Sequence, residues 1–140
     1  MLFRSKLAVP NDILQKPGAL TDEEFDEIKK HPEVGSELVR ELGFSKQVAA
    51  LVLDHHERLD GSGYPRGLGA PDLDIETRIL ALCDVFDALL SNRVYRDAWT
   101  LEDALDHVSK ESGTKFDPAC VDALERVIAR EQAEAGRRAA

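Results

Sequence analysis

Two adjacent histidines constrain this chain more than any other feature of its sequence. His55 and His56 stand near the end of an apolar run with helical spacing, before a loop that contains glycines and a Tyr64-Pro65 step. Neighbouring residues on a helix point about 100° apart, so both imidazoles cannot face water if the helix packs. A buried imidazole needs a partner. Metal coordination is one interpretation. The alternative, a core histidine bonded to a carbonyl beside a solvated neighbour, would be favoured for an isolated His-His pair.

The composition indicates one globular domain and excludes several classes of protein. The 140 residues are 43% hydrophobic and 32% charged, which is ordinary for a folded domain. The net charge of −9 argues against non-specific nucleic-acid binding, so an anionic ligand would need a local basic cluster or a metal. We expect no membrane segment and no secretory signal. Cys83 and Cys120 form no CxxC motif and are expected to be buried thiols in a reducing cytoplasm.

Apolar residues recur with helical spacing along most of the chain, and no segment alternates as a strand would. Thr21 and Glu24 fit a capping box that starts a helix, and Pro32 fits the first turn of the next one. We expect an irregular segment over residues 1–20, six helices over 21–31, 32–43, 45–57, 74–90, 100–113 and 117–130, and a polar tail over 131–140. The predicted fold class is all-α, a bundle of about six helices forming one domain over residues 21–130.

Two acids stand in an apolar context on one face of the helix expected over residues 74–90. Burying Asp84 or Asp87 costs free energy unless the carboxylate is paired, hydrogen-bonded or coordinates a metal. Exposure to solvent is a fair alternative for Asp87 and a poor one for Asp84. His31 precedes a helix-initiating proline and is easily aimed into a groove, although a solvated histidine fits equally well. His107 is expected on the plain surface.

Basic groups cluster after this acidic helix. Arg93 and Arg96 flank Tyr95, and a guanidinium donates two parallel hydrogen bonds that suit a phosphate. Solvated loop arginines are commoner, so the cluster is suggestive only. The glycine-containing loop over residues 61–65 could be a simple helix connection. Glycines also let the backbone approach a ligand closely, and Tyr64 could stack on a purine base.

Together these motifs resemble the HD-GYP family, the metal-dependent phosphodiesterases that hydrolyse cyclic di-GMP in bacteria. The resemblance covers residues 6–130 and rests on HPEVG, on HHER followed by DGSGYPRG, and on DVFDAL, in that order. The matching segments are residues 10–14, 16–18, 20–24, 31–35, 55–58, 60–67, 84–89, 93, 95–96 and 113–118. So many ordered motifs favour metal coordination over a purely structural role for the histidines.

The resemblance implies a role for three sets of residues. The implied metal ligands are His31, His55 and His56 on one ion and Asp84 on a neighbouring one. The implied substrate contacts are Gly63, Tyr64, Pro65, Asp87, Arg93 and Arg96. The resemblance also gives a catalytic role to Lys6. The implied cofactors are divalent metal ions, with iron or manganese favoured for mixed histidine and carboxylate sites. Such a centre activates water and neutralises the phosphodiester oxygens of cyclic di-GMP or a related nucleotide.

The sequence departs from the family pattern before its first matching segment. The family carries His-Asp-Ile-Gly-Lys directly before Leu-Ala-Val-Pro, whereas here only the lysine, Lys6, is kept. The four preceding positions are Leu2, Phe3, Arg4 and Ser5. By the resemblance, the absent aspartate bridges two metals, and helices upstream of it bring further ligands. We therefore expect the C-terminal two-thirds of the family domain, in a truncated or inactive form that hydrolyses cyclic di-GMP negligibly by itself.

Two alternatives for the function remain open. The chain could be a non-catalytic module that binds metal, nucleotide or a diguanylate-cyclase-type partner, or an enzyme whose missing ligands come from another polypeptide. Loss of the upstream helices would expose apolar side chains, so we also expect a homodimer. The side chains expected to form its interface are Val48, Val52, Ile79 or Phe86.

Overall fold

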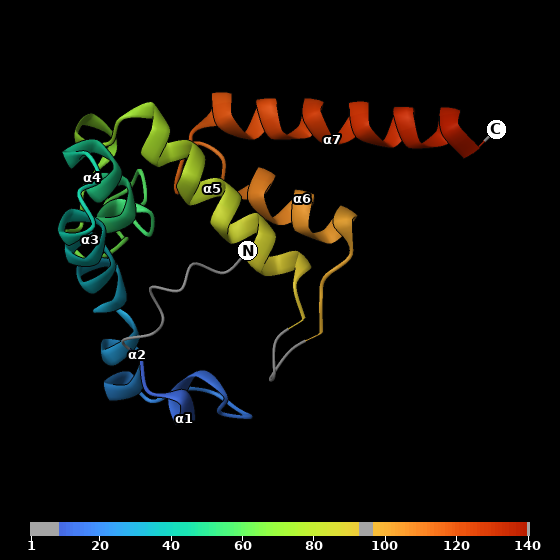
Figure 1. Cartoon of the computed structure of the whole chain (residues 1–140). Coiled ribbons are helices and arrows are strands. Elements are labelled where there is room, and N and C mark those ends of the chain that lie inside the picture. The colour runs from blue at the N-terminus through green and yellow to red at the C-terminus, as the bar shows by residue number, and fades with distance from the viewer. Residues whose placement is uncertain (1–8, 93–96, 140) are drawn as a thin grey trace.

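Helices make up the regular structure of this protein. The computed structural model describes residues 9–92 and 97–139 (Figure 1). In chain order the elements are α1 (Asn11–Leu14), α2 (Asp22–Ile28), α3 (His31–Glu41), α4 (Lys46–Asp54), the 3₁₀ turn η2 (Ala70–Asp72), α5 (Ile75–Leu90), α6 (Leu101–Lys110) and α7 (Pro118–Ala139). No strand occurs within these two ranges, and the predicted all-α fold class is confirmed.

Side-chain caps determine where several helices begin. At α2 the Glu24 N–H donates to Thr21 Oγ1 and the Thr21 N–H donates to Glu24 Oε2, which is the expected capping box. Ser45, Asp74 and Thr100 each accept from the backbone N–H three residues later, at the starts of α4, α5 and α6. Such caps satisfy N–H groups that have no partner within the helix and contribute about 1 kcal/mol each.

The central helix is α5, which packs against α4 on one side and against α6 and α7 on the other (Figure 1). The apolar core lies on the α6 and α7 side. Its buried members are Leu82, Phe86, Leu89, Ala104, Val108, Phe116, Cys120 and Val121. On the other side α3 and α4 form a helical hairpin, in which Ser36 Oγ donates to the Ala49 carbonyl at 2.8 Å. The fold thus joins an apolar core to a hairpin that uses polar contacts.

An ion pair joins the first turns of α5 and α7. Arg78 NH1 lies 2.8 Å from Asp117 Oδ2, and the other guanidinium nitrogens donate to the carbonyls of Ala70 and Leu73. Asp117 Oδ1 accepts from the Ala119 N–H at the start of α7. The hydrogen bond from Arg78 holds the pKa of Asp117 below its usual value. This bridge fixes η2 and the start of α7 relative to α5.

The last helix is longer than the sequence analysis expects. It continues to Ala139, through residues assigned above to a polar tail. Alanine, glutamate, glutamine and arginine are strong helix formers, and they dominate this segment. Arg130 Nε also pairs with Glu134 Oε1 at 3.1 Å, one turn along the same face. Local propensity therefore extends α7 beyond the core, as Figure 1 shows.

The apolar surface also differs from the expectation. Val52 and Phe86 are buried and Val48 is half-buried, so of the four side chains named for an interface only Ile79 is largely exposed, at 47%. Phe86 is covered because it belongs to the core that α5 shares with α6 and α7. The expected exposed patch is therefore wrong for three of its four members.

An apolar groove of about 450 Å³ lies between the facing sides of α5 and α7. Ile79, Cys83 and Val127 are among the side chains that line it. Cys83 is exposed there, which corrects the expectation of a buried thiol, whereas Cys120 is buried as expected. The difference arises because Cys120, in the first turn of α7, belongs to the apolar core, whereas Cys83 lies on α5 beside the open groove.

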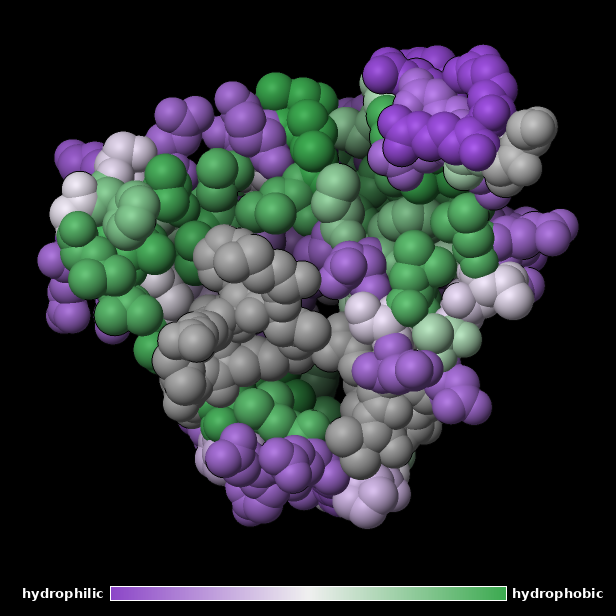
Figure 2. All heavy atoms as spheres, turned by 45° about the vertical axis from the view of Figure 1, so that its right-hand side comes forward, coloured by the Kyte–Doolittle hydropathy of each residue, from purple (hydrophilic) through white to green (hydrophobic). Residues whose placement is uncertain are grey.

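Hydrophilic and hydrophobic residues are unevenly distributed over the surface. Figure 2 shows hydrophilic side chains covering the projecting end of α7, at the upper right, and hydrophobic ones over the body of the molecule beside it. Among the described helices, none combines the length and the apolar character that crossing a membrane requires.

Candidate metal centre

Three histidines from the ends of two helices form a compact cluster. His31 is the first residue of α3, and His55 and His56 follow α4, which ends at Asp54, earlier than the sequence analysis expects. One ligand atom from each imidazole lies within 4.8 Å of the other two. The ring centroids of His55 and His56 are 3.9 Å apart, and that of His31 lies 5.4 Å and 4.9 Å from them. The imidazoles converge as the sequence predicts; their role as ligands remains a prediction.

Backbone carbonyls fix the tautomers of two of these rings. His31 Nδ1 lies 2.6 Å from the Ile28 carbonyl, and His55 Nδ1 lies 2.7 Å from the Val52 carbonyl. A carbonyl oxygen only accepts, so each Nδ1 carries the proton and each Nε2 presents its lone pair. Histidines that bind metals are commonly oriented by such a bond from the other ring nitrogen. Both residues therefore have the tautomer that metal coordination through Nε2 requires.

The spacing of the ring nitrogens fits a shared ion. His31 Nε2 and His56 Nε2 are 3.1 Å apart. Nitrogen ligands at about 2.0–2.1 Å from one ion lie roughly 3 Å from each other. The His31 side chain is almost fully buried, at 2% exposure, and burial lowers the pKa of the His55 imidazole. The lowered pKa favours the neutral form of the His55 imidazole, which is the form that binds metals. The donor set and its protonation thus fit a divalent transition metal.

The two aspartates of α5 lie at the edge of this cluster. Asp84 Oδ2 is 3.6 Å from His56 Nδ1, with its side chain 44% exposed, so α5 brings one carboxylate beside the imidazoles. Asp87 lies one turn further along α5 and is exposed. Neither belongs to the compact set of donor atoms found among the described residues. Asp84 could hold an ion next to one bound by the histidines, whereas Asp87 faces solvent.

The loop after the histidines returns to the end of α4. A Cβ at Gly63 would lie 2.4 Å from Glu57 Cα, so only glycine allows this approach. The Tyr64 N–H donates to the His56 carbonyl at 3.3 Å, and the Tyr64 ring lies over the His56 ring with centroids 4.7 Å apart. Burial raises the pKa of the Tyr64 phenol to about 12. The Tyr64–Pro65 bond is cis. These residues therefore form one wall of the histidine cluster.

Three of the candidate site residues named in the sequence analysis lie outside the described residues. They are Lys6, Arg93 and Arg96. Their catalytic and substrate-binding roles remain predictions that rest on the resemblance alone.

The structure adds buried polar groups that the sequence analysis did not single out. Glu57 is 1% exposed, and its carboxylate accepts from the backbone of the loop. Asp54 is also buried, and it pairs with the Arg66 guanidinium. The only available signal was the position of Glu57 directly after the two histidines, since nothing in a charged residue's sequence context reveals that three amides will surround it.

Arg58 is a second residue that the sequence analysis quoted without assigning a role. Its guanidinium donates to the Glu57 carbonyl at 2.8 Å and lies over the Phe116 ring, 5.4 Å from the centroid. Burial lowers the pKa of Arg58, and the charge of Asp84 acts in the opposite direction. A cation thus lies among the acids near the cluster, where it moderates their combined negative charge.

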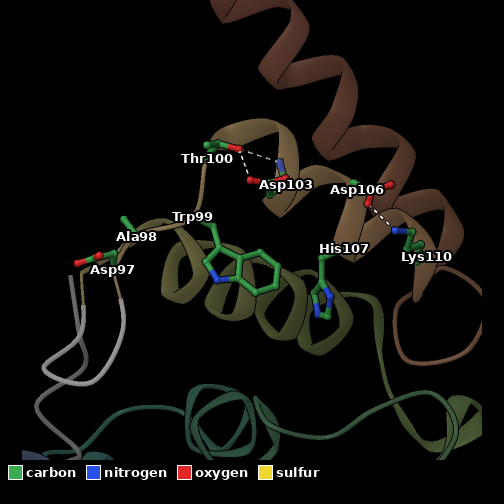
Figure 3. Close-up of a pocket in the computed structure, with 8 residues that line it drawn as sticks. All are labelled: Asp97, Ala98, Trp99, Thr100, Asp103, Asp106, His107 and Lys110. Atoms are coloured by element: carbon green, nitrogen blue, oxygen red, sulfur yellow. Dashed lines mark hydrogen bonds and ion pairs between the residues drawn. The ribbon is translucent and has the colours of Figure 1, made fainter. Parts of the chain in front are cut away.

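A separate hollow of about 700 Å³ lies along α6 and does not include the clustered histidines (Figure 3). Trp99 and His107 line it, with ring centroids 5.4 Å apart and nearly perpendicular planes. The expectation that His107 is a plain surface residue is therefore corrected: it is half-buried against an indole. Figure 3 shows Asp103 bonded to the Thr100 hydroxyl and Lys110 bonded to Asp106 around the rim. The three acids that line the hollow, Asp97, Asp103 and Asp106, outnumber its one lysine.

Comparison with known proteins identifies the family of this chain. The HD domain family matches residues 2–120. The cyclic di-GMP phosphodiesterase response regulator RpfG of Xanthomonas campestris is 49% identical over 123 residues, which are 86% of this chain and 32% of that protein. The 3'3'-cGAMP-specific phosphodiesterase 2 of Vibrio cholerae is 41% identical over 124 residues, 85% of this chain and 23% of that protein. The chain spans about a third or less of the length of these curated relatives.

Solved structures show the same fold at lower identity. The HDG"Y"P protein Bd1817 of Bdellovibrio bacteriovorus superposes with a TM-score of 0.69 at 20% identity, over 89% of this chain and 40% of that one. A cyclic GMP-AMP specific phosphodiesterase of V. cholerae gives a TM-score of 0.60 at 20% identity, over 89% of this chain and 33% of that one.

Proposed function

The chain belongs to the HD domain family, among its HD-GYP members, and from this we propose that it supplies the metal- and nucleotide-binding part of a cyclic dinucleotide phosphodiesterase. The observation that carries the proposal is the convergence of His31, His55 and His56 beside Asp84. Three converging imidazoles with one carboxylate nearby suit the binding of a cation. Imidazole and carboxylate donors suit iron or manganese, which are our proposed cofactors.

Side chains of this chain would position the metal ions. His31 and His55 would bind one ion through Nε2 because their Nδ1–H groups donate to carbonyls. His56 would complete that ligand set, and Asp84 would bind a neighbouring ion. Bound divalent ions of this kind lower the pKa of a coordinated water and neutralise phosphodiester oxygens. Tyr64 would keep bulk water from one side of the cluster, since its ring lies over His56.

The proposed substrate is a cyclic dinucleotide such as cyclic di-GMP. The names of the relatives cite cyclic di-GMP and 3'3'-cGAMP, which share two purines and two phosphodiesters. The residues proposed to contact the substrate are Gly63, Tyr64, Pro65, Asp87, Arg93 and Arg96. The two arginines would hold the phosphate that is not being cleaved, because guanidinium groups match phosphate geometry. The net charge of −9 makes such local basic groups necessary.

We propose that the 140-residue chain binds metal and nucleotide without appreciable turnover. Leu2, Phe3, Arg4 and Ser5 stand where the family has its His-Asp pair, so the carboxylate expected to bridge two metals has no counterpart. Lys6, to which we assign a catalytic role, would then act only when that carboxylate is supplied. The second candidate function, a non-catalytic binding module, is favoured by the same four residues.

Titration of the purified chain with Mn²⁺, by calorimetry, followed by incubation with cyclic di-GMP tests this proposal. The expected result is a saturable Mn²⁺ site and negligible release of linear dinucleotide. His107→Ala, which lies outside the cluster, should keep the site. Absence of any Mn²⁺ or Fe²⁺ site would contradict the proposal. Robust hydrolysis that His55→Ala abolishes would contradict only the claim of inactivity.

A homodimer and a cytoplasmic location also remain proposals. The groove between α5 and α7 supports the dimer, because Ile75, Ile79 and Val127 are each about half exposed there. The groove has an apolar lining without charged residues, so a symmetric contact in which each copy covers the groove of its partner would remove it from water. Light scattering over a dilution series would reveal it; a monomer at all concentrations would contradict it. A diguanylate-cyclase-type partner is proposed on the resemblance alone.

A further inference from the structure

The carboxylate that follows the paired histidines faces away from them. Glu57 is buried, and both of its oxygens are used by the returning loop. Oε1 accepts from the backbone N–H groups of Arg66 and Gly67 at 2.7 and 3.1 Å, and Oε2 accepts from that of Leu68 at 2.9 Å. Glu57 is not one of the clustered donor groups. A buried carboxylate is stable only when such bonds replace its water, so these three amides account for its burial.

A second buried acid holds the same segment one turn earlier in the chain. Asp54 Oδ1 accepts from Arg66 Nε at 3.0 Å, and Asp54 Oδ2 pairs with the other arm of that guanidinium. The contact is bidentate and therefore fixes direction as well as distance. Asp54 binds the side chain of residue 66, whereas Glu57 binds the main chain of residues 66–68. The two acids together hold both parts of this segment against the end of α4.

The near end of the loop is held by close packing. Gly63 approaches the backbone of residues 56–58 more closely than any Cβ would allow. Tyr64 follows immediately, with its N–H on the His56 carbonyl and its ring over the His56 ring. The chain between Tyr64 and Arg66 is only one residue long. A displacement of residues 66–68 would therefore move Tyr64, and the movement of Tyr64 would in turn shift the His56 ring that it contacts.

We propose that Glu57 is a positioning residue for the metal centre. Its carboxylate holds residues 66–68 so that Tyr64 stays against His56, and this contact sets the orientation of the His56 ring within the cluster. The effect on metal affinity rests on the proposed function. The effect on the loop does not.

Glu57→Gln tests the proposal with little change in shape. The glutamine keeps one acceptor oxygen and places an NH₂ group where an oxygen now accepts, so the bonds to all three amides cannot be kept. We expect hydrogen exchange at Arg66, Gly67 and Leu68 to accelerate by about 10- to 100-fold. We expect the nuclear Overhauser contact between the Tyr64 and His56 rings to weaken. Mn²⁺ affinity should fall by about 10-fold, as for other groups that orient a ligand.

Glu57→Asp is the second variant, because it keeps the charge and shortens the reach by one methylene. If position is what matters, Glu57→Asp will behave like Glu57→Gln; wild-type exchange and affinity in Glu57→Asp would overturn the proposal. This variant also carries the test if the glutamine variant does not fold.

Val108→Ala serves as the control for a general loss of stability. Val108 is completely buried in the apolar core on the α6 and α7 side of α5, and it belongs neither to the loop nor to the histidine cluster. At a matched decrease in Tm, Val108→Ala should leave the exchange of residues 66–68 and the Mn²⁺ affinity of the folded protein unchanged. An equal fall in affinity in both variants would show that Glu57 acts through stability alone, and would overturn the proposal. If the wild type binds no Mn²⁺, the proposed function fails, while loop exchange and the ring contact still decide the role of Glu57.

Discussion

The two sides of α5 are built on different physical principles. On the side of α6 and α7 the buried residues are apolar, and Ala104 and Val108 are completely inaccessible. On the side of α3 and α4 the buried residues include polar and charged ones. Four of the five buried polar residues in the described chain lie there, namely His31, Ser36, Asp54 and Glu57. The apolar side chains that stabilise the fold therefore lie on one side of α5, and the polar side chains that position the histidine cluster lie on the other.

The difference follows from the two kinds of interaction. Apolar burial is roughly proportional to area and has no preferred direction, so a core tolerates small shifts of its side chains. Hydrogen bonds to charged groups are directional, and leaving one unmade in the interior costs about 1–3 kcal/mol. A cluster of ligands must be held within a fraction of an ångström, which apolar packing alone does not achieve. Substitutions on the two sides should therefore affect different observables.

The largest effect on metal binding should come from His55→Ala. One of three converging nitrogens is lost, and the remaining two should leave no measurable Mn²⁺ site at micromolar protein. Calorimetric titration checks this, with His107→Ala as the matched control, because that histidine lies in the hollow along α6. Equal Mn²⁺ affinities for His55→Ala and the wild type would contradict the assignment of metal binding to the α3 and α4 side of α5.

Leu82→Ala should have the largest effect on stability. Leu82 is almost fully buried in the apolar core, and removing it should cost about 2–5 kcal/mol in the free energy of unfolding. The Mn²⁺ affinity of the folded protein should not change, since Leu82 lies in the core that α5 shares with α6 and α7. Urea unfolding measures the loss, and Leu42→Ala, at the exposed position directly after α3, is the control expected to show little change.

Asp117→Asn should produce a smaller and pH-dependent loss. The pKa of Asp117 is lowered from 3.8 in the folded protein, so its contribution is present above that value and disappears as the pH falls through the folded pKa. We expect the variant to be about 1–3 kcal/mol less stable than the wild type at pH 7. The difference should shrink below pH 3.8. Urea unfolding at pH 7 and at pH 3 tests it; a difference independent of pH would contradict the role of the ion pair.

Gly136→Ala should have the smallest effect, and in the opposite direction. Gly136 lies in the projecting part of α7, and a Cβ there would meet no atom within 4 Å. Alanine is favoured over glycine inside a helix by about 1 kcal/mol, so amide exchange near the end of α7 should slow. Neither Mn²⁺ affinity nor the cooperative unfolding midpoint should move measurably. A large rise in the midpoint would show that this end of α7 contributes to the core.

The helices could be predicted from the sequence because they depend on local signals, and the convergence of the histidines could be predicted because the motifs resemble a known family. The capping box at Thr21 and the apolar spacing of α5 each involve residues that are close together in the sequence, and the resemblance rests on the order of the motifs. The buried role of Glu57 could not be predicted, because it depends on amides ten residues away that approach only once the loop has folded. The burial of Phe86 likewise depends on α6 and α7, which no local pattern in α5 reveals.

The placement of His31 and His55 at the two ends of a helical hairpin has a mechanical consequence. A metal ion shared by these residues would close α3 and α4 into a ring, so the hairpin could open only after the ion had left. With the ion bound, the free energy needed to open the hairpin would increase with the logarithm of the free ion concentration. Removing the ion with a chelator would then loosen the attachment of α3 before any other part of the molecule. The chelator would therefore cause selective local unfolding at the hairpin.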